Sequence, residues 1–327
     1  MNMKRISLFA GLVLVGELQL ELPEGFKVTN MVANGGDYIY GMADSSRIAY
    51  LMKWSADGKL LRKSLSEACC GYLCLTKDYL VVSEQTTSRL TLFTLDLEYI
   101  KEIILETRCP PPATTFGHKH VYPLEDGSLL VIGKYISGDT FSLASVWDTT
   151  GKFLRVFIFP DSAWAKLQPF TASPVYCESN GDVVLAVDFF PFKLYVVSIR
   201  GKGELLDSFT VRIKGHKNFS TPEGSAAEEY DPFIKWMEDE CRSNQPVLGG
   251  LSYCLSNGMV VFKSSQCASV VDINMSPCLG IYDPAKKKVI WTKDWDASVL
   301  GGIRGDTLLL NKKGDCGSGR LQKAVIK

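Results

Sequence analysis

One phrase recurs along the sequence, and this repetition constrains the fold more than any other feature. In each copy a turn leads to an apolar strand, a polar loop, a second strand, a tight turn and a third strand. The copies occupy residues Gly35–Leu65, Lys77–Ile103, Asp126–Phe157, Asn180–Phe209, Asn257–Trp291 and Arg304–Ile326. Runs of Val, Ile, Leu, Tyr and Phe bounded by Gly, Asp and Asn predict strands and hairpins.

A short apolar stretch, such as HKHVYPL before the third copy, adds an innermost strand to a unit. Four strands per unit and about fifty residues per unit are typical of β-propeller blades. A two-sheet sandwich of this length would need about twenty strands in one core, which is far above the usual range. The sequence therefore predicts an all-β, six-bladed β-propeller that forms a single domain over residues 17–327.

The sixth copy ends before its outermost strand, and the start of the chain carries the missing pattern. GELQLEL, from Gly16 to Leu22, matches GKLLRKSL of the first copy and GKFLRVF of the third. We expect Glu17–Leu22 to complete the last blade, because a strand from the other chain end leaves fewer exposed sheet edges.

The longest connection, Val211–Gly250, lies between the fourth and fifth units and contains the one convincing helix, Asp231–Arg242. Asp231 can cap this helix and Pro232 suits its first turn. An α/β fold would need helices between successive strands, so this single inserted helix argues against one.

The first sixteen residues have the pattern of a signal peptide, with Lys4 and Arg5 before the apolar run Ile6–Val15. Cleavage after Gly16 would lead to export to the periplasm or cell surface. The alternative is a buried strand in a cytoplasmic protein. Ten cysteines without a CxxC motif are expected to be reduced and structural, which weighs against export. No run reaches the ~18–20 apolar residues of a transmembrane segment.

Three stretches resemble the six-bladed β-propellers of the NHL-like group, which includes many exported bacterial proteins. They are Asp44–Leu61, Phe190–Phe209 and Cys278–Trp291. The resemblance extends over nearly the whole chain after Gly16 and implies a fold, with little about function. Two places depart from the group's pattern: LDLEYI in the second copy lacks the glycine turn, and the loop Ser264–Pro277 is long.

Propellers bind ligands at their loops and central channel, so candidate residues are sought there. His118 and His120 would share one face of a strand. They could hold a divalent metal, with His216 as a third ligand, or be ordinary hydrogen-bonded side chains. Trp164 lies in the link between the third and fourth units, where an aromatic ring can stack on a sugar or cap the core.

Charged residues flank the polar loops of three copies and could form a ring around a binding mouth. The pairs are Asp44 with Arg47, Glu84 with Arg89, and Asp188 with Lys193. Local salt bridges repeated with the strand pattern are the simpler interpretation.

The sequence contains no G-x-S-x-G, P-loop or H-E-x-x-H motif. We therefore expect a monomeric, non-catalytic propeller that binds a protein or a glycan-like ligand, with no cofactor. The alternative is a metal-assisted enzyme of the lyase or lactonase type that uses His118 and His120. Lys plus Arg and Asp plus Glu both number 36, so no strong positive field favours a nucleic-acid partner.

Overall fold

The described strands form four four-stranded sheets and one eight-stranded sheet, and we divide the eight-stranded sheet between β2 and β22 so that each unit named below has four strands. The computed structural model describes residues 12–34, 36–45, 48–66, 71–84, 88–106, 120–137, 140–158, 175–179, 183–189, 192–210, 231–232, 235–236, 239, 247–254, 260–266, 276–283, 286, 288–293, 297–312 and 317–326. Everything said below about structure concerns these residues.

Each unit contains four successive strands, except that the last unit takes its fourth strand from the start of the chain. Unit 1 is β2 (Lys27–Asn34), β3 (Tyr38–Ser45), β4 (Ile48–Ser55) and β5 (Leu60–Ser66). Unit 2 is β6 (Gly71–Leu75), β7 (Tyr79–Glu84), β8 (Arg89–Thr94) and β9 (Tyr99–Ile104). Unit 3 is β10 (His120–Pro123), β11 (Leu129–Ser137), β12 (Thr140–Trp147) and β13 (Phe153–Ile158). Unit 4 is β14 (Val175–Ser179), β15 (Val183–Phe189), β16 (Phe192–Ser198) and β17 (Glu204–Thr210). Unit 5 is β18 (Val247–Cys254), β19 (Val260–Gln266), β20 (Ser276–Asp283) and β21 (Lys288–Lys293). Unit 6 is β22 (Ala297–Ile303), β23 (Thr307–Lys312), β24 (Arg320–Ile326) and β1 (Leu12–Gln19).

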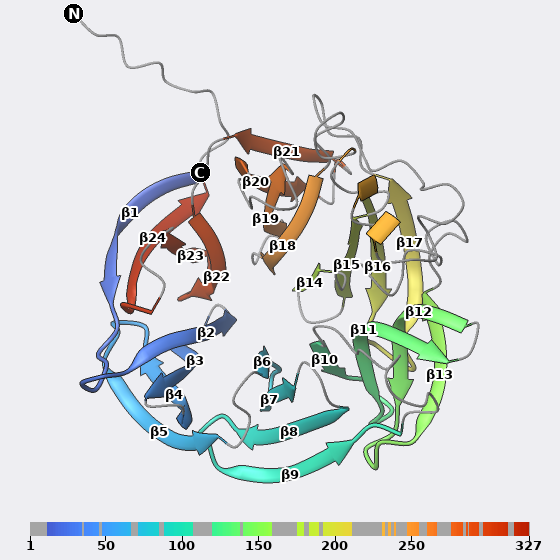
Figure 1. Ribbon diagram of the computed structural model, residues 1–327, viewed down its shortest axis with the longest axis horizontal. Coiled ribbons are helices and arrows are strands. Elements are labelled where there is room, and N and C mark those ends of the chain that lie inside the picture. Colours follow the sequence, from blue (N-terminus) through green and yellow to red (C-terminus); the bar gives the residue numbers. More distant parts are fainter. Residues whose placement is uncertain are drawn as a thin grey trace, which may run out of the picture.

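The units are arranged around a common centre, as in a β-propeller (Figure 1). The first strand of each unit is innermost and the fourth is outermost. Units 6 and 1 join into one eight-stranded sheet, because the inner strands β2 and β22 pair in parallel, Ala33 with Gly301 and Asn34 with Gly302. A Cβ atom on Gly301 would lie 2.4 Å from the Ala33 carbonyl oxygen, so this joint requires glycine.

The first and last described strands, β1 and β24, lie side by side, as the sequence predicts for a strand near the start of the chain. β1 pairs antiparallel with β24 from Leu12 opposite Ile326 to Gln19 opposite Arg320. The predicted bounds, Glu17–Leu22, are wrong at both ends of the strand. Backbone pairing continues back to Leu12, while the amide of Glu21 leaves the strand and donates to the Gly58 carbonyl at 2.8 Å.

The core lies between neighbouring units, because their second and third strands are apolar on both faces. Trp54 and Leu18 belong to the cluster between units 6 and 1. Leu51 and Leu80 belong to the next, between units 1 and 2. The outermost strand β5 is mostly exposed, whereas β3 and β4 are mostly buried.

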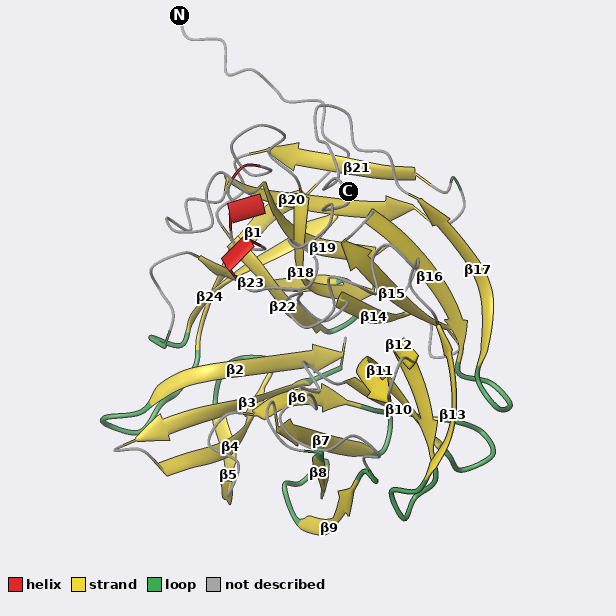
Figure 2. Ribbon diagram, turned by 45° about the vertical axis from the view of Figure 1, so that its right-hand side comes forward, coloured by secondary structure: helices red, strands yellow, loops and turns green. Residues whose placement is uncertain are grey.

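Helix is scarce in the described part of the chain, where Figure 2 shows short helical pieces beside many strands. Residues 231, 232, 235, 236 and 239 are helical, in agreement with the predicted inserted helix. No helix in the described ranges is long and apolar enough to cross a membrane.

The strand ends of each unit fall into two sets. Where the connections are described, short hairpins join the first strand to the second, and the third to the fourth; we call these strand ends, and the corresponding ones of the other units, the turn ends. The connections from second to third strand, and onward to the next unit, begin and end at the opposite ends, which we call the loop ends. Because neighbouring strands are antiparallel, all loop ends of one sheet lie on the same side of it.

The hairpin between the third and fourth strands, which we call the outer turn, docks on the preceding unit. In unit 1 the outer turn contains Gly58, whose added Cβ would lie 2.2 Å from the Gln19 carbonyl oxygen. In unit 3 the same place is taken by Gly151, whose added Cβ would lie 2.1 Å from the Ile104 carbonyl oxygen. At these two joints the backbones approach too closely for any side chain.

Candidate functional site

Of the five candidate ligand-binding residues His118, His120, Arg47, Trp164 and Asp188, two lie within described strands, and both stand at loop ends. His120 is the first residue of β10 and is half-buried, opposite Ile132 of β11. Asp188 is the next-to-last residue of β15 and lies opposite Lys193 of β16. The strand ends therefore bring both positions to the same side of their sheets, in the adjacent units 3 and 4.

The other three residues, His118, Arg47 and Trp164, lie outside the described residues, as does His216. The common strand face expected for His118 and His120 therefore stays a prediction. Within the described ranges, no three His, Cys, Asp or Glu side chains are grouped so as to hold a metal ion.

The predicted pair at the loop end of unit 2 is joined by charge. The Arg89 Nε lies 3.8 Å from a Glu84 carboxylate oxygen, and its Nη1 donates to Glu102 at 3.1 Å. β7, β8 and β9 are neighbours in one sheet, so one guanidinium bridges three strands. For this pair the structure agrees with the simpler interpretation of the sequence, a local salt bridge. Because the side chains are partly exposed, the ion pairs contribute about 1 kcal/mol or less to stability.

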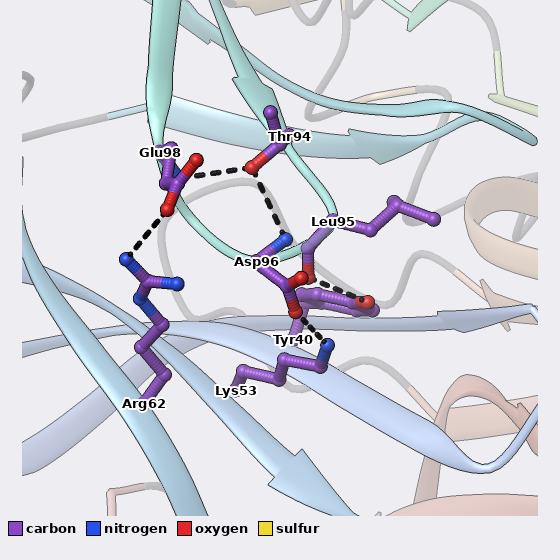
Figure 3. Close-up of polar contacts among 7 residues, drawn as sticks. All are labelled: Tyr40, Lys53, Arg62, Thr94, Leu95, Asp96 and Glu98. Atoms are coloured by element: carbon purple, nitrogen blue, oxygen red, sulfur yellow. Dashed lines mark hydrogen bonds and ion pairs between the residues drawn. The ribbon is translucent and has the colours of Figure 1, made fainter.

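The most elaborate polar cluster was not predicted and lies at the joint between units 1 and 2 (Figure 3). Lys53, on the otherwise apolar strand β4, is only 8% exposed. Its Nζ donates to the Asp96 carboxylate at 2.7 Å and lies 4.2 Å from the centre of the Tyr38 ring. The ammonium is thereby held between a carboxylate and an aromatic face, which offsets its partial loss of hydration.

Tyr40 and Asp96 titrate differently from free side chains at this joint. The Tyr40 hydroxyl donates to the Leu95 carbonyl at 3.1 Å, and burial, with smaller effects of Asp96 and Tyr38, raises the Tyr40 pKa to about 12. The hydrogen bond and charge of Lys53 lower the pKa of Asp96 below its usual value. Both shifts keep the tyrosine neutral and the aspartate charged over the ordinary pH range.

The outer turn of unit 2 is itself fixed by hydrogen bonds, which orient these partners. The Thr94 hydroxyl accepts from the amides of Asp96, at 3.2 Å, and Glu98, at 3.1 Å. Glu98 then receives a hydrogen bond from Arg62 of β5 at 3.1 Å (Figure 3). The cluster attaches one unit to the next, and its chemistry is that of a structural joint. The sequence signal for it was a lysine inside an apolar strand together with two tyrosines.

A second ionic cluster holds the turn ends of units 6 and 1 together. Arg304 donates to Asp37 at 3.3 Å and to Asp57 at 2.9 Å, and its amide donates to the Gly36 carbonyl at 2.9 Å. These hydrogen bonds hold Arg304 at a φ of 45°, which is uncommon for a side-chain-bearing residue. The Arg-Gly-Asp tripeptide that begins at Arg304 is thus the turn between β22 and β23 of unit 6, and its arginine contacts unit 1.

Comparison with known proteins shows likeness in fold. No family model matches the sequence, and no curated protein matches it in sequence. The chain is similar to a member of the DUF4221 family from Bacteroides vulgatus, with a TM-score of 0.64, 11% identity, and 97% of this chain and 98% of that chain covered. It is also similar to a Bacteroides fragilis protein described as a candidate exported protein, with a TM-score of 0.63, 13% identity, and 99% and 98% covered. At these identities the likeness shows a shared propeller-type fold and leaves binding and catalysis undecided.

Proposed function

We propose that the chain is an exported, six-bladed β-propeller of the NHL-like kind that binds a protein or a glycan-like ligand without catalysis. The ligand would bind at the loop ends of the inner strands and the mouth of the central channel. This proposal rests on one observation: the candidate residues lie at or beside loop ends of their units. His120 and Asp188 are at loop ends of units 3 and 4, and Ser45, the last residue of β3 before Arg47, is at a loop end of unit 1.

Convergence of the inner strands supports this location. The first strands of the units lie nearest the centre, so their loop ends are closer together than those of the outer strands (Figure 1). The connections at turn ends are short, such as residues 56–59 and 148–152, whereas those at loop ends include 105–119, 159–174 and 211–246. Long connections on a rigid scaffold are where propellers and other folds place their binding residues.

The described charges at the loop end of unit 2 offer polar groups to a ligand. Glu84, Arg89 and Glu102 are joined into one ion-paired group. Its carboxylates can accept hydrogen bonds from hydroxyl or amide groups of a ligand.

The test compares variants at the two sets of strand ends. Binding of an oligosaccharide panel and of candidate protein partners is measured for the full chain and for Asp188→Asn, Arg47→Ala and the double variant His118→Ala/His120→Ala. Lys77→Ala, on the exposed turn between β6 and β7, is the matched control at a turn end. At least one loop-end variant should weaken binding about tenfold, the effect of losing one good polar contact, and the control should leave it unchanged.

Two results would redirect the proposal. Weaker binding in Lys77→Ala alone would move the site to the turn ends. A stoichiometric bound divalent metal together with substrate turnover, both lost in His118→Ala/His120→Ala, would favour the metal-assisted enzyme of the lyase or lactonase type. Export has its own measurement, since the amino terminus of the native protein should then lie near Glu17.

A further inference from the structure

One face of unit 1 carries two aromatic rings that hold a lysine. The rings of Phe26, just before β2, and Tyr50, on β4, have centres 5.2 Å apart and planes at 54° to each other. The Lys63 Nζ, from β5, lies 5.0 Å from the centre of the first ring and 4.9 Å from the centre of the second. Both rings are half-buried against the core between units 6 and 1, whereas Lys63 is exposed. An ammonium is attracted to aromatic faces at these distances, so the rings restrain this lysine although it lies at the surface.

Strand register brings these side chains together, and we call Phe26, Tyr50 and Lys63 the aromatic–lysine patch. Tyr50 lies opposite Leu65, and Met52 lies opposite Lys63. Lys63 is therefore a diagonal neighbour of Tyr50 on the same face of the sheet, within reach of a long side chain. This face looks toward unit 6, because Met52 belongs to the cluster between units 6 and 1.

The aromatic–lysine patch adjoins the loop end of unit 1. A Cβ atom added to Gly25, in the turn before β2, would lie 3.7 Å from the Ser45 Oγ at the end of β3. Ile48, the first residue of β4, and Leu65 of β5 add apolar surface, with exposed fractions of 48% and 59%. Ile48 and Tyr50 share a strand face because they are two residues apart. Rings, aliphatic side chains and one ammonium thus gather beside a loop end.

Two lysines of unit 1 differ in what their ammonium groups contact. Lys53 is 8% exposed and donates to the Asp96 carboxylate at 2.7 Å. Among the described residues, by contrast, neither the Lys63 ammonium nor the Tyr50 hydroxyl has a hydrogen-bond or ion-pair partner. The Lys63 ammonium therefore has N–H donors left for a ligand. Its position on the rings also lowers the entropy that a mobile surface lysine would lose on binding.

We propose that the aromatic–lysine patch binds a carboxylate-bearing sugar, the uronate unit of an acidic glycan. The Lys63 ammonium pairs with the carboxylate, the Tyr50 hydroxyl bonds a sugar hydroxyl, and Leu65 with the open parts of the rings packs on the apolar C–H face. One cation suits one carboxylate. Glu24, exposed two residues before Phe26, disfavours a ligand of higher negative charge such as a phosphate. This inference rests on the proposed function, because it names the ligand class for a glycan bound at loop ends.

The test measures affinity by titration calorimetry with the full chain. The probes are tetramers of galacturonate, glucuronate and mannuronate, and their methyl esters, which keep the sugar chain and remove the charge. At least one acid tetramer should bind about tenfold more tightly than its ester, the effect of one charge-assisted hydrogen bond. The ratio of acid to ester affinity is taken within each variant, so a smaller folded fraction cancels from it.

Four variants locate the binding site. Lys63→Met keeps the apolar stem and should reduce the acid-to-ester ratio to about one, while Lys63→Arg should retain most of it. Tyr50→Phe removes only the hydroxyl and should weaken binding about threefold. Lys59→Met is the matched control, because Lys59 is an exposed lysine of the same unit, in its outer turn, and should leave the ratio unchanged.

Three results would overturn the proposal and leave the proposed function to its own test on the loop-end variants. The first is that no acid tetramer binds more tightly than its ester. The second is that Lys63→Met and Lys59→Met have equal effects, or that Asp188→Asn abolishes uronate binding while Lys63→Met does not. The third is tighter, Lys63-dependent binding of a tetraglutamate peptide than of any uronate tetramer, which would assign the patch to an acidic protein segment.

Discussion

The outer turns of units 1 and 2 both pack on the preceding unit, but they do so through different contacts. In unit 1, Gly58 has a φ of 87° and its carbonyl accepts from the amide of Glu21, just after β1, at 2.8 Å. In unit 2 the equivalent residue is Leu97, with a φ of 61° and a side chain that is only 2% exposed. Both turns have the same backbone path, since Gly58 N donates to Ser55 O and Leu97 N to Thr94 O, each at 2.9 Å.

The comparison shows that turn shape is maintained while the means of docking changes. Glycine allows backbone to touch backbone. Leucine at this position adopts an unfavourable φ, and the fold compensates by burying its side chain against unit 1 and adding the Lys53–Asp96 and Arg62–Glu98 ion pairs. The missing glycine in LDLEYI therefore marks a joint built from side chains.

The largest effect is expected at the backbone joint. Gly58→Ala should lower the free energy of unfolding by about 3 kcal/mol, because it adds a clash to an unfavourable φ. Gly127→Ala is the matched control: its φ is 83° and nothing lies within 4 Å of the added Cβ. The control should cost about 1 kcal/mol. Urea denaturation measures both, and equal losses would show that the close approach at Gly58 does not matter.

Substitutions of Leu97 in the outer turn of unit 2 should rank in a defined order of stability. Leu97→Ala should cost about 3 kcal/mol, since it opens a cavity in the cluster between units 1 and 2 and keeps the positive φ. Leu97→Gly removes the same side chain but relieves the backbone, so it should be more stable than Leu97→Ala by about 1 kcal/mol. An alanine variant more stable than the glycine variant would mean that Leu97 bears no backbone strain.

The Lys53–Asp96 ion pair at the same joint should make the free energy of unfolding fall as the pH is lowered into the acid range. The Asp96 pKa is lower in the folded protein than its usual value of 3.8, chiefly because of the hydrogen bond from Lys53. Its contribution is thus present above pH 3.8 and is lost as the pH falls through the lower folded value. Asp96→Asn should therefore be destabilising at neutral pH and have no effect in strong acid. The difference should vanish at every pH in a Lys53→Met background; its persistence there would assign it to other partners.

The smallest effect is expected at alkaline pH. Tyr40 ionises at about pH 12 in the folded protein, against 10.0 for a free tyrosine, so folding favours its neutral form. The stability this contributes is present below pH 10.0 and is lost as the pH rises towards 12. Tyr40→Phe should remove a step near pH 12 from a phenolate absorbance titration. A titration curve unchanged by this substitution would contradict the burial argument.

Strand pattern was readable from the sequence because it depends on local chemistry. Alternating apolar runs and glycine turns mark the strands, and the short apolar stretches mark the inner ones. The bounds of β1 were not readable, since Leu12–Val15 resembles a leader segment and only pairing with Ala324–Ile326 makes it a strand.

For the candidate site, the sequence predicted only where along the strands the residues would lie. Positions such as His120 and Asp188 fall at loop ends because strand order dictates it. The Lys53 cluster depends on residues 43 positions apart that meet only when two units pack, so no local pattern specifies it.

Pairing of the two chain ends is the claim on which the circular arrangement depends, and a cross-strand disulfide tests it directly. Glu17 lies opposite Gln322. Directly paired antiparallel residues have Cα atoms about 4.5–5.5 Å apart, within the range for a disulfide. The double variant Glu17→Cys/Gln322→Cys should form this bond on mild oxidation, as shown by mass spectrometry of the linked peptides, and should raise the Tm. The pair Leu14→Cys/Gln322→Cys, which is out of register, should not link. Absence of the 17–322 link, or equal linking of both pairs, would contradict the account.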